Sequence, residues 1–425
     1  MLPTPWPAPY RADPIDATVS LPGSKSLTNR ALILSALAEG RSQISLPLIS
    51  RDTDLMAGAL RALGVGIETH DDRWTITPAA WGEQSGAARV DCGLAGTVMR
   101  FVPPVAALSS GPVAFDGDPR ARERPMDAIV SSLRTLGVEI DDRGTGTLPF
   151  TVHGHGSVAG GVVTIDASAS SQFVSALLLA GARYDKGLDI RHVGKPVPSM
   201  PHIEMTLSQL RLRGVTVDDS DANRWVVRPG PIAPLDTEIE ADLSNAGAFI
   251  AAALVTRGRV RIANWPDATD QAGDRWREIA QQFGAEVTAV DGDLVVTAPK
   301  TLPGLELDLH DEGELTPVVA AVSALADSSS HLTGVGHLRG HETDRLAAIA
   351  AEINRLGGKV VELDDGLSIT PQPLHGGAFE TYSDHRMAHA GVLIGLAVEG
   401  VGVVDIDTTD KTFPGFAAAW ARFVS

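Results

Sequence analysis

The chain has 425 residues, of which 44% are hydrophobic and 21% charged, and its formal net charge is −18. This length and composition are typical of a soluble protein with two or more domains. The negative charge argues against nucleic acid as the main partner. The single cysteine, Cys92, excludes a disulfide framework within the chain and a CxxC metal site.

The apolar segments give no sign of export or membrane insertion. The N-terminal residues lack the apolar core of a secretory signal, and no apolar run approaches the roughly 20 residues of a membrane span. The longest candidate, Gly391 to Ile406, contains Glu399 and several glycines, so we interpret it as a buried helix followed by a strand. We expect a cytoplasmic protein without a membrane partner.

A strongly apolar helix recurs along the chain. In chain order, such helices are expected to start near Ser26, Thr97, Ser171, Asn245, Thr316 and Arg386. A helix that is apolar nearly all round is buried rather than lying on a surface. Because the starts are spaced by about 70 to 74 residues, the sequence predicts six copies of one structural unit.

The first five apolar helices are each followed by a second helix-like phrase that ends in glycine. These glycines are Gly64, Gly137, Gly214, Gly284 and Gly357. A glycine commonly ends a helix, and the alternating residues that follow each phrase predict a strand. Most phrases continue through a polar turn into another strand, as in RWTITP and RWVVRPG.

The sixth unit differs because its outer helix, GFAAAWARFV, stands at the C-terminus. Its missing strand is expected to come from the N-terminal IDATVSL, so both chain ends would lie in one lobe. We predict an α/β fold of two similar lobes, each with three βαβαββ-type units and buried helices (an inside-out α/β barrel). One lobe comprises residues 1–21 and 236–425, and the other comprises residues 22–235.

Two other architectures are compatible with a repeat of this length. A helical solenoid is disfavoured because each unit alternates helix and strand. A ring-shaped clamp for nucleic acid should carry basic residues on its inner helices, whereas these helices are apolar. Both rank below the two-lobe α/β fold.

The starts of the buried helices suggest anion binding. A helix N-terminus offers unpaired N–H groups and about half a positive charge, so several together form an anion receptor. Simple N-capping explains one or two such starts. It does not explain the basic residues grouped beside them, which are Lys25, Arg30, Arg100, Arg120, Arg122, Arg124, Arg345, Arg386 and Lys411. Because Arg and Lys bind carboxylate and phosphate, this grouping predicts a ligand with several negative charges.

The sequence predicts no metal and no cofactor. PGSKS lacks the spacing of an NTPase phosphate-binding loop. His385 and His389 are four residues apart on one helix face but lack the Glu of HExxH, so His389 is interpreted as a packed or polar histidine.

Six phrases carry a family resemblance: SLPGSKSLTNRALILSALAEG, GLAGTVMRF, DGDPRARERPM, SASSQFVSALLLA, RGHETDRLA and SDHRMAHAG. In this order they resemble the 5-enolpyruvylshikimate-3-phosphate (EPSP) synthase family, and the resemblance runs through the whole chain. The family fold, two domains of three repeated units each, agrees with the repeat count above.

The resemblance implies two sets of substrate contacts. Those for shikimate 3-phosphate are Lys25, Ser26, Arg30, Ser170, Ser171, Gln172, Ser199, Glu314 and His341. Those for phosphoenolpyruvate are Lys25, Gly96, Arg124, Gln172, Arg345, Arg386 and Lys411. The catalytic residues implied are Glu314, Lys25 and Glu342. The active site is then expected in the interdomain cleft of a monomer.

The resemblance also implies the reaction, an addition–elimination. Glu314 accepts or steers the proton of the shikimate 5-hydroxyl, whose oxygen attacks the central carbon of phosphoenolpyruvate. Lys25 or Glu342 protonates the methylene carbon. The tetrahedral intermediate then loses phosphate, leaving the enol ether.

Five positions depart from the commonest family pattern. Leu94 replaces Asn, Phe101 replaces Pro, Glu314 replaces Asp, His341 replaces Lys, and His202 lies near the usual Tyr. These changes bear on affinity, pH dependence and inhibitor tolerance.

Two other functions are weighed against this one. The sister transferase acting on UDP-N-acetylglucosamine typically uses a loop cysteine, and DGDPRARERPM contains none. A catalytically silent anion-binding relative is disfavoured because Glu314 and Glu342 accompany the cations.

Overall fold

The computed structural model describes residues 4–82 and 86–425, which group into two compact units. One unit contains the residues up to Pro22 together with Ala241–Ser425, and the other is Gly23–Glu240. We refer to them as the split unit and the continuous unit. No helix of the described residues is long and apolar enough to cross a membrane.

Among the described residues, six helices form the interior, three in each unit, and nearly all their residues are buried. They are α1 (Lys25–Leu37), α3 (Gly96–Ala106) and α5 (Gln172–Gly181) in the continuous unit, and α7 (Leu243–Thr256), α9 (Thr316–Ala324) and α11 (His385–Ala397) in the split unit. Each begins within two residues of its predicted start, so these predictions are confirmed.

Amphipathic helices alternate with the buried ones. They are α2 (Arg51–Ala62), α4 (Asp127–Thr135), α6 (Pro201–Leu212), α8 (Trp276–Gln282), α10 (Arg345–Arg355) and α12 (Phe416–Val424). The five predicted glycines that follow α2, α4, α6, α8 and α10 have φ between 76° and 92°. This left-handed conformation suits glycine and ends each helix.

The continuous unit has three four-stranded sheets. The first has the order β14 (Thr237–Glu238), β3 (Ser42–Ser45), β5 (Arg73–Thr77) and β4 (Gly66–Thr69). The second has the order β6 (Ala88–Asp91), β7 (Pro112–Asp116), β9 (Phe150–His153) and β8 (Glu139–Asp141). The third has the order β10 (Gly161–Ile165), β11 (Leu188–His192), β13 (Arg224–Val227) and β12 (Val217–Asp218).

The split unit has two four-stranded sheets and one of three strands. The first has the order β16 (Glu286–Val290), β17 (Asp293–Thr297), β15 (Arg259–Ile262) and β2 (Asp16–Val19). The second has the order β18 (Glu306–Asp308), β19 (Ser330–Thr333), β21 (Gly366–Thr370) and β20 (Lys359–Leu363). The third has the order β1 (Trp6–Pro7), β23 (Val401–Val403) and β22 (Gly377–Phe379).

One pairing pattern recurs in three of the four-stranded sheets of the described residues, those that contain β7, β11 and β19. Two parallel strands flank a buried helix in the chain, as β6 and β7 flank α3, and two antiparallel strands complete the sheet. This is the predicted order of helices and strands, and it makes the fold a mixed α/β fold with several sheets. In the described residues, each sheet is open at both edges.

Two strands do not join the sheet of the repeat unit whose buried helix follows them in the chain. The predicted place of IDATVSL in the sixth unit is therefore wrong. The strand β2 precedes α1 in the chain but pairs in parallel with β15, and β14 precedes α7 but pairs in parallel with β3. IDATVSL therefore completes the β15 sheet rather than the sixth unit. The strand added to the sixth unit is β1, which pairs antiparallel with β23.

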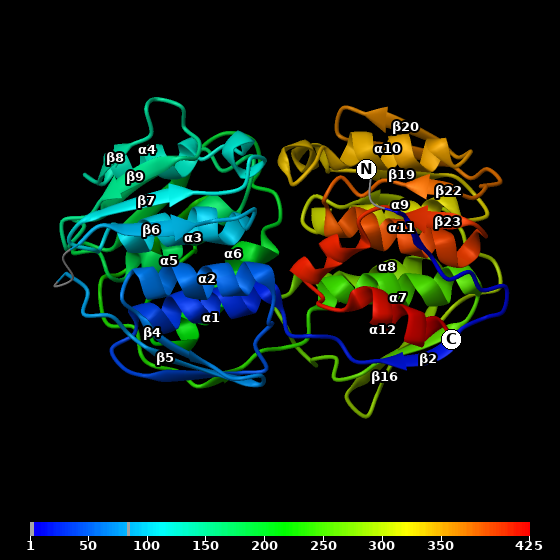
Figure 1. Cartoon of the computed structure of the whole chain (residues 1–425), viewed down its shortest axis with the longest axis horizontal. Helices are drawn as coiled ribbons and strands as arrows, with labels where there is room; N and C mark the ends of the chain where they lie inside the picture. Colours follow the sequence, from blue (N-terminus) through cyan, green and yellow to red (C-terminus); the bar gives the residue numbers. More distant parts are fainter. Residues whose placement is uncertain (1–3, 83–85) are drawn as a thin grey trace. The chain divides into compact units, whose positions relative to one another are not determined.

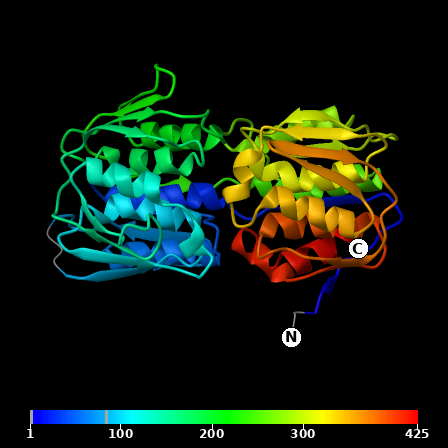
Figure 2. The same cartoon turned by 90° about the horizontal axis from the view of Figure 1, so that it is seen from above.

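Both views show how the N-terminal segment reaches these sheets. In Figure 1 the blue start of the described chain passes beside β23, with which β1 pairs, and in Figure 2 it projects from the edge of the orange and red segments. In Figure 1, β2 runs beside α12, which it contacts. Sequence pattern predicts that a strand forms, but not which neighbour it joins, because alternation reports only which face is buried.

Candidate active site

In the continuous unit, the starts of the three buried helices are joined by side-chain hydrogen bonds. Asn29 Nδ2 of α1 donates to Thr97 Oγ1 of α3 at 2.8 Å. Arg100 Nη1 of α3 donates to Gln172 Oε1 of α5 at 2.7 Å. The positive ends of these helices therefore lie close together, as an anion receptor requires.

Lys25 and Arg30 extend from α1 in different surroundings. The Lys25 ammonium lies 3.4 Å from Asp52 Oδ2, and its side chain is 18% exposed. Arg30 is buried, and its guanidinium donates to Thr206 Oγ1 at 2.8 Å and to the Ser26 carbonyl oxygen at 3.1 Å. Lys25 is therefore the more accessible cation. Arg30 instead stabilises the backbone at Ser26 through a buried hydrogen bond.

The side chain of Phe101 explains one departure from the family pattern in physical terms. The Arg30 guanidinium lies 5.3 Å from the centroid of the Phe101 ring, a cation–π distance. Phe101 is fully buried. It thus supplies a face on which Arg30 is held.

Gly96 lies against two arginines. A Cβ atom at this position would stand 3.0 Å from Arg100 Nη1 and 3.2 Å from both terminal nitrogens of Arg124. Arg100 and Arg124 are both buried. Because Gly96 has no side chain, the two guanidinium groups can reach the N-terminus of α3.

We expect Gly96→Ala to raise KM for phosphoenolpyruvate by on the order of tenfold, because the added methyl group displaces Arg124 and a lost hydrogen bond to a charged group is worth about 1.5–3 kcal/mol. Steady-state kinetics with each substrate varied in turn checks this. Gly58→Ala is a matched control, because a Cβ there meets nothing within 4 Å. An unchanged KM in Gly96→Ala would contradict the assigned contact.

Three further serines of the predicted site lie on the loops before α5 and α6. Ser170 Oγ accepts from the Gln172 backbone N–H at 3.3 Å, and Ser171 is buried. Ser199 has φ of 56°, in the left-handed region that a serine seldom adopts. Such a backbone conformation is concentrated at binding sites.

Three neighbouring arginines of the DPRARERP phrase have different roles. Arg122 binds Asp116 through two nitrogens, both at 2.9 Å, and Arg120 pairs with Glu123; these four side chains are exposed or partly exposed. Arg124 is buried beside Gly96. The structure therefore brings Arg124 to the helix starts, but not Arg120 or Arg122.

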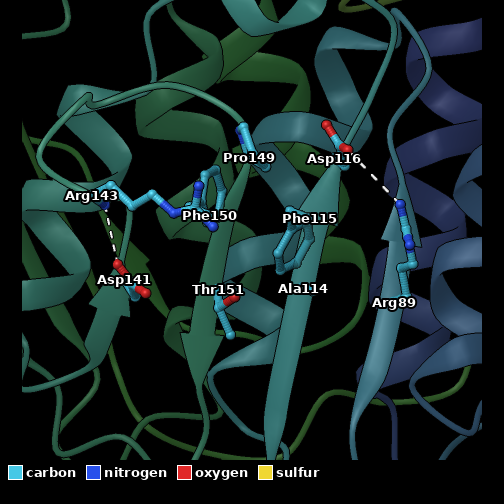
Figure 3. A pocket seen from close by; sticks show the side chains of 9 residues that line it. All are labelled: Arg89, Ala114, Phe115, Asp116, Asp141, Arg143, Pro149, Phe150 and Thr151. Atoms are coloured by element: carbon cyan, nitrogen blue, oxygen red, sulfur yellow. Dashed lines mark hydrogen bonds and ion pairs between the residues drawn. The ribbon is translucent and has the colours of Figure 1, made fainter.

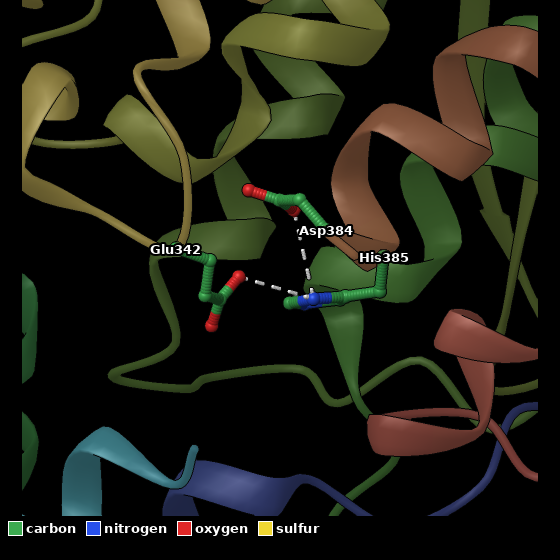
Figure 4. A group of neighbouring side chains, drawn as sticks. All are labelled: Glu342, Asp384 and His385. Carbon is green, nitrogen blue, oxygen red and sulfur yellow. Dashed lines mark ion pairs between the residues drawn. The ribbon is translucent and has the colours of Figure 1, made fainter. Parts of the chain in front are cut away.

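In the split unit, Glu342 is the centre of a charged cluster (Figure 4). Its carboxylate pairs with the Lys411 ammonium, and its Oε2 lies 3.2 Å from Arg345 Nη2 and 3.4 Å from His385 Nδ1. Asp384 caps α11 and accepts from Arg345 Nε at 2.8 Å. Figure 4 shows His385 directed toward both carboxylates.

The cluster favours the charged forms of Glu342 and Arg345. Burial alone would raise the pKa of Glu342, but Lys411, His385 and Arg345 hold it well below its ordinary value. Burial alone would lower the pKa of Arg345, but Asp384 and Glu342 raise it. Glu342 is therefore a carboxylate at neutral pH.

A second group forms around Glu314, which lies just before α9, and Ser244, at the start of α7. Ser244 Oγ donates to Glu314 Oε1 at 2.6 Å, and Arg386 Nη2 lies 3.5 Å from Glu314 Oε2. Arg386 Nη1 donates to Asn245 Oδ1 at 3.1 Å. His341 lies beside the first group, with Nδ1 at 3.4 Å from Arg345 Nη1.

Glu342, Asp384 and His385 also place three possible metal-ligand atoms within 4.8 Å of one another. Arg345 and Lys411 already bind the two carboxylates. The two carboxylates therefore form a charge network that holds the Arg345 and Lys411 side chains in position. His389, one turn further along α11, is fully buried and packs on Phe416 with ring centroids 4.7 Å apart.

A hollow of about 220 Å³ lies elsewhere, on the solvent-facing side of the β6–β7–β9–β8 sheet (Figure 3). Figure 3 shows Ala114 and Thr151 on its floor, with Arg89 and Asp116 on one side. The charged atoms of Arg89 and Asp116 lie 3.9 Å apart. None of the predicted site residues lines this hollow, so we do not assign the chemistry to it.

Sequence reasoning did not single out Asp384, Ser244 or Asn245. Each stands at the start of a buried helix, where Asp, Ser and Asn are usual caps. Asp384 is the cap of α11, whereas Ser244 and Asn245 follow Asp242, the cap of α7. Only their contacts to Arg345, Glu314 and Arg386 distinguish them from other polar residues at helix starts. In the sequence, the signal that could have identified them is their position at the predicted helix starts, where the predicted cations are also grouped.

Known proteins resemble this chain over nearly its whole length. The family model of EPSP synthase (3-phosphoshikimate 1-carboxyvinyltransferase) matches residues 9–420. A curated relative from Kocuria rhizophila, a 3-phosphoshikimate 1-carboxyvinyltransferase, is 54% identical over 428 aligned positions, which cover 99% of this chain and 96% of the relative.

Two solved structures share the fold. The EPSP synthase of Acinetobacter baumannii has a TM-score of 0.81 at 24% identity, covering 97% of this chain and 96% of that one. The enolpyruvyl transferase NikO of Streptomyces tendae has a TM-score of 0.75 at 15% identity, with the same coverage. By its match to the family model and to the curated relative, the chain belongs to the EPSP synthase (3-phosphoshikimate 1-carboxyvinyltransferase) family.

Proposed function

We propose that the chain transfers the enolpyruvyl group of phosphoenolpyruvate to the 5-hydroxyl of shikimate 3-phosphate and releases phosphate, as a step of aromatic amino-acid biosynthesis. The observation that carries this proposal is the grouping of Arg345, Arg386 and Lys411 around two carboxylates, Glu342 and Glu314. Cations grouped in this way suit a doubly anionic substrate, and the carboxylates can handle protons beside it.

Both units contribute substrate contacts in this proposal. In the continuous unit they are Lys25, Ser26, Arg30, Gly96, Arg124, Ser170, Ser171, Gln172 and Ser199. In the split unit they are Glu314, His341, Arg345, Arg386 and Lys411. Each unit corresponds to one lobe of three repeats, with helices inside and sheets outside.

The reaction proceeds by addition and elimination. Glu314, oriented by Ser244, accepts the proton of the 5-hydroxyl group. At the same time, the hydroxyl oxygen bonds to the central carbon of phosphoenolpyruvate. The double-bond electrons form a C–H bond at the methylene carbon. A proton of the new methyl group then returns to the Lys25 amine, and its C–H electrons re-form the double bond as the carbon–oxygen bond to phosphate breaks. The products are the enol ether and inorganic phosphate.

The proton donated to the methylene carbon comes from Lys25 in this proposal. The lowered pKa of Glu342 supports this assignment, because an ionised carboxylate has no proton to donate at neutral pH. Glu342 instead keeps Lys411 and Arg345 in position. We also infer a monomeric cytoplasmic enzyme that needs no cofactor.

The proposal is tested by phosphate release in the presence of shikimate 3-phosphate and phosphoenolpyruvate, with each substrate omitted in turn. We expect release only with both, and a product heavier than shikimate 3-phosphate by one enolpyruvyl group. Release that depends on UDP-N-acetylglucosamine would favour the sister transferase. Binding of both ligands without release would favour a silent relative.

The state of Cys92 disfavours the sister transferase. Its thiol is fully buried at the end of β6, and burial raises its pKa above the ordinary value. A reactive cysteine needs an accessible thiolate. Cys92 therefore does not act as a loop cysteine.

A further inference from the structure

The side chain of Asn245 links three parts of the split unit. It is fully buried at the start of α7. Its neighbours are Arg386, at the start of α11, and Thr412, which directly follows Lys411. Two of the cations in the candidate site are therefore connected to one amide.

Both ends of this amide are occupied. Oδ1 accepts from Arg386 Nη1 and from Thr412 Oγ1, each at 3.1 Å. Nδ2 donates to the Thr412 carbonyl oxygen at 2.9 Å. A reversed amide would direct its N–H groups at the guanidinium, so these contacts require the oxygen to face Arg386.

Asn245 holds Arg386 without using all of its donors. Nη1 faces Asn245 and Nη2 faces Glu314, whereas the buried Nε has no hydrogen-bond partner among the described residues. A buried donor without a partner is costly unless a ligand or water satisfies it. The guanidinium is thus fixed with a donor still available.

The second link acts on the backbone that carries Lys411. The two bonds to Thr412 fix the residue after Lys411, at the end of the short helix Ile406–Lys411. Lys411 in turn pairs with Glu342. Loss of the amide would therefore release Arg386 directly and Lys411 through its backbone.

We propose that Asn245 is a positioning residue that presents Arg386 and Lys411 together to phosphoenolpyruvate. The inference rests on the proposed function and assigns Asn245 no direct contact with substrate. Positioning groups lower the cost of ordering the binding cations when the ligand arrives. Binding of phosphoenolpyruvate should therefore depend on Asn245 more than binding of shikimate 3-phosphate does.

The test compares Asn245→Ala and Asn245→Asp with the unchanged chain. Asn245→Ala removes all three hydrogen bonds of the amide. Asn245→Asp keeps the acceptor oxygen but removes the donor to Thr412 and places a negatively charged carboxylate beside Arg386. We expect both to raise KM for phosphoenolpyruvate by on the order of tenfold or more, with KM for shikimate 3-phosphate changed less than about twofold.

Asn354→Ala is the matched control. The Asn354 amide also makes two backbone bonds in the split unit, at 2.8 and 2.7 Å to Val360, but it contacts none of the site cations. We expect a lower melting temperature and an unchanged KM for phosphoenolpyruvate. If Asn245→Ala does not fold, Asn245→Asp and Thr412→Val provide the same comparison.

Equal changes in both KM values, or none, in folded Asn245 variants would overturn the inference. Absence of turnover in the unchanged chain would instead count against the proposed function. In that case, calorimetric titration with phosphoenolpyruvate alone still tests the role of Asn245. Weaker binding by Asn245→Ala than by Asn354→Ala supports the inference, and equal binding overturns it.

Discussion

Glu342→Ala is expected to lower kcat by on the order of a thousandfold. The substitution removes the anion shared by Lys411, Arg345 and His385, all of which are largely buried. Breaking a buried ion pair by removing one partner costs about 3–5 kcal/mol, because the remaining charge lacks compensation. Lys411, whose ammonium pairs directly with the Glu342 carboxylate, should move most.

Steady-state kinetics and thermal unfolding check this result together. Glu352→Ala is the matched control, because Glu352 is also fully buried in the split unit and binds a cation, Arg355, at 2.8 Å. That control should lose stability but keep kcat. Glu342→Gln preserves the shape without the charge, so near-normal turnover in this variant would contradict an electrostatic role for Glu342.

Lys25→Ala is expected to reduce turnover by at least about a thousandfold and to raise both KM values. The Lys25 ammonium is a partly accessible cation at the start of α1 and is the proposed proton donor. Like charges about 4 Å apart repel by about 4 kcal/mol at an intermediate effective dielectric, so two anionic substrates need a cation beside them. Both the affinity for the two substrates and the rate of the chemical step should therefore fall.

Kinetics of Lys25→Ala and Lys25→Arg separates these two roles. Arginine keeps a charge for binding but gives up a proton far less readily, so Lys25→Arg should recover KM more than kcat. Lys186→Ala, at an exposed turn of the continuous unit, is the control and should change neither parameter. Near-normal kinetics in Lys25→Ala would refute the assignment.

Local elements of the fold could be predicted from the sequence because their signals are local. An all-apolar helix must be buried, and a glycine after an amphipathic helix marks its end, as at Gly64 and Gly357. The pairing of β2 with β15 could not be predicted in this way. Strand partners are selected by packing between segments far apart in the chain, which a pattern of alternation does not report.

The candidate site was predictable in its cations but not in its supports. The grouping of basic residues indicated Arg124 together with its neighbours, and the family resemblance implied Arg124 alone. In the structure, burial distinguishes Arg124 from Arg122. Asn245 was predicted as part of a helix start, because an Asn there ordinarily caps the helix. Its bonds to Arg386 and Thr412 depend on how α7, α11 and the segment after Lys411 pack.

The pairing of β2 with β15 has a consequence for the order of folding during synthesis. Gly23–Glu240 is one uninterrupted stretch, so its core can form as soon as the ribosome has released it. Asp16 must wait for its partner Arg259, which is translated after that whole stretch. The strand β2 is therefore made before the whole continuous unit but acquires its strand partner only after it, and it needs protection from other strand edges in the meantime.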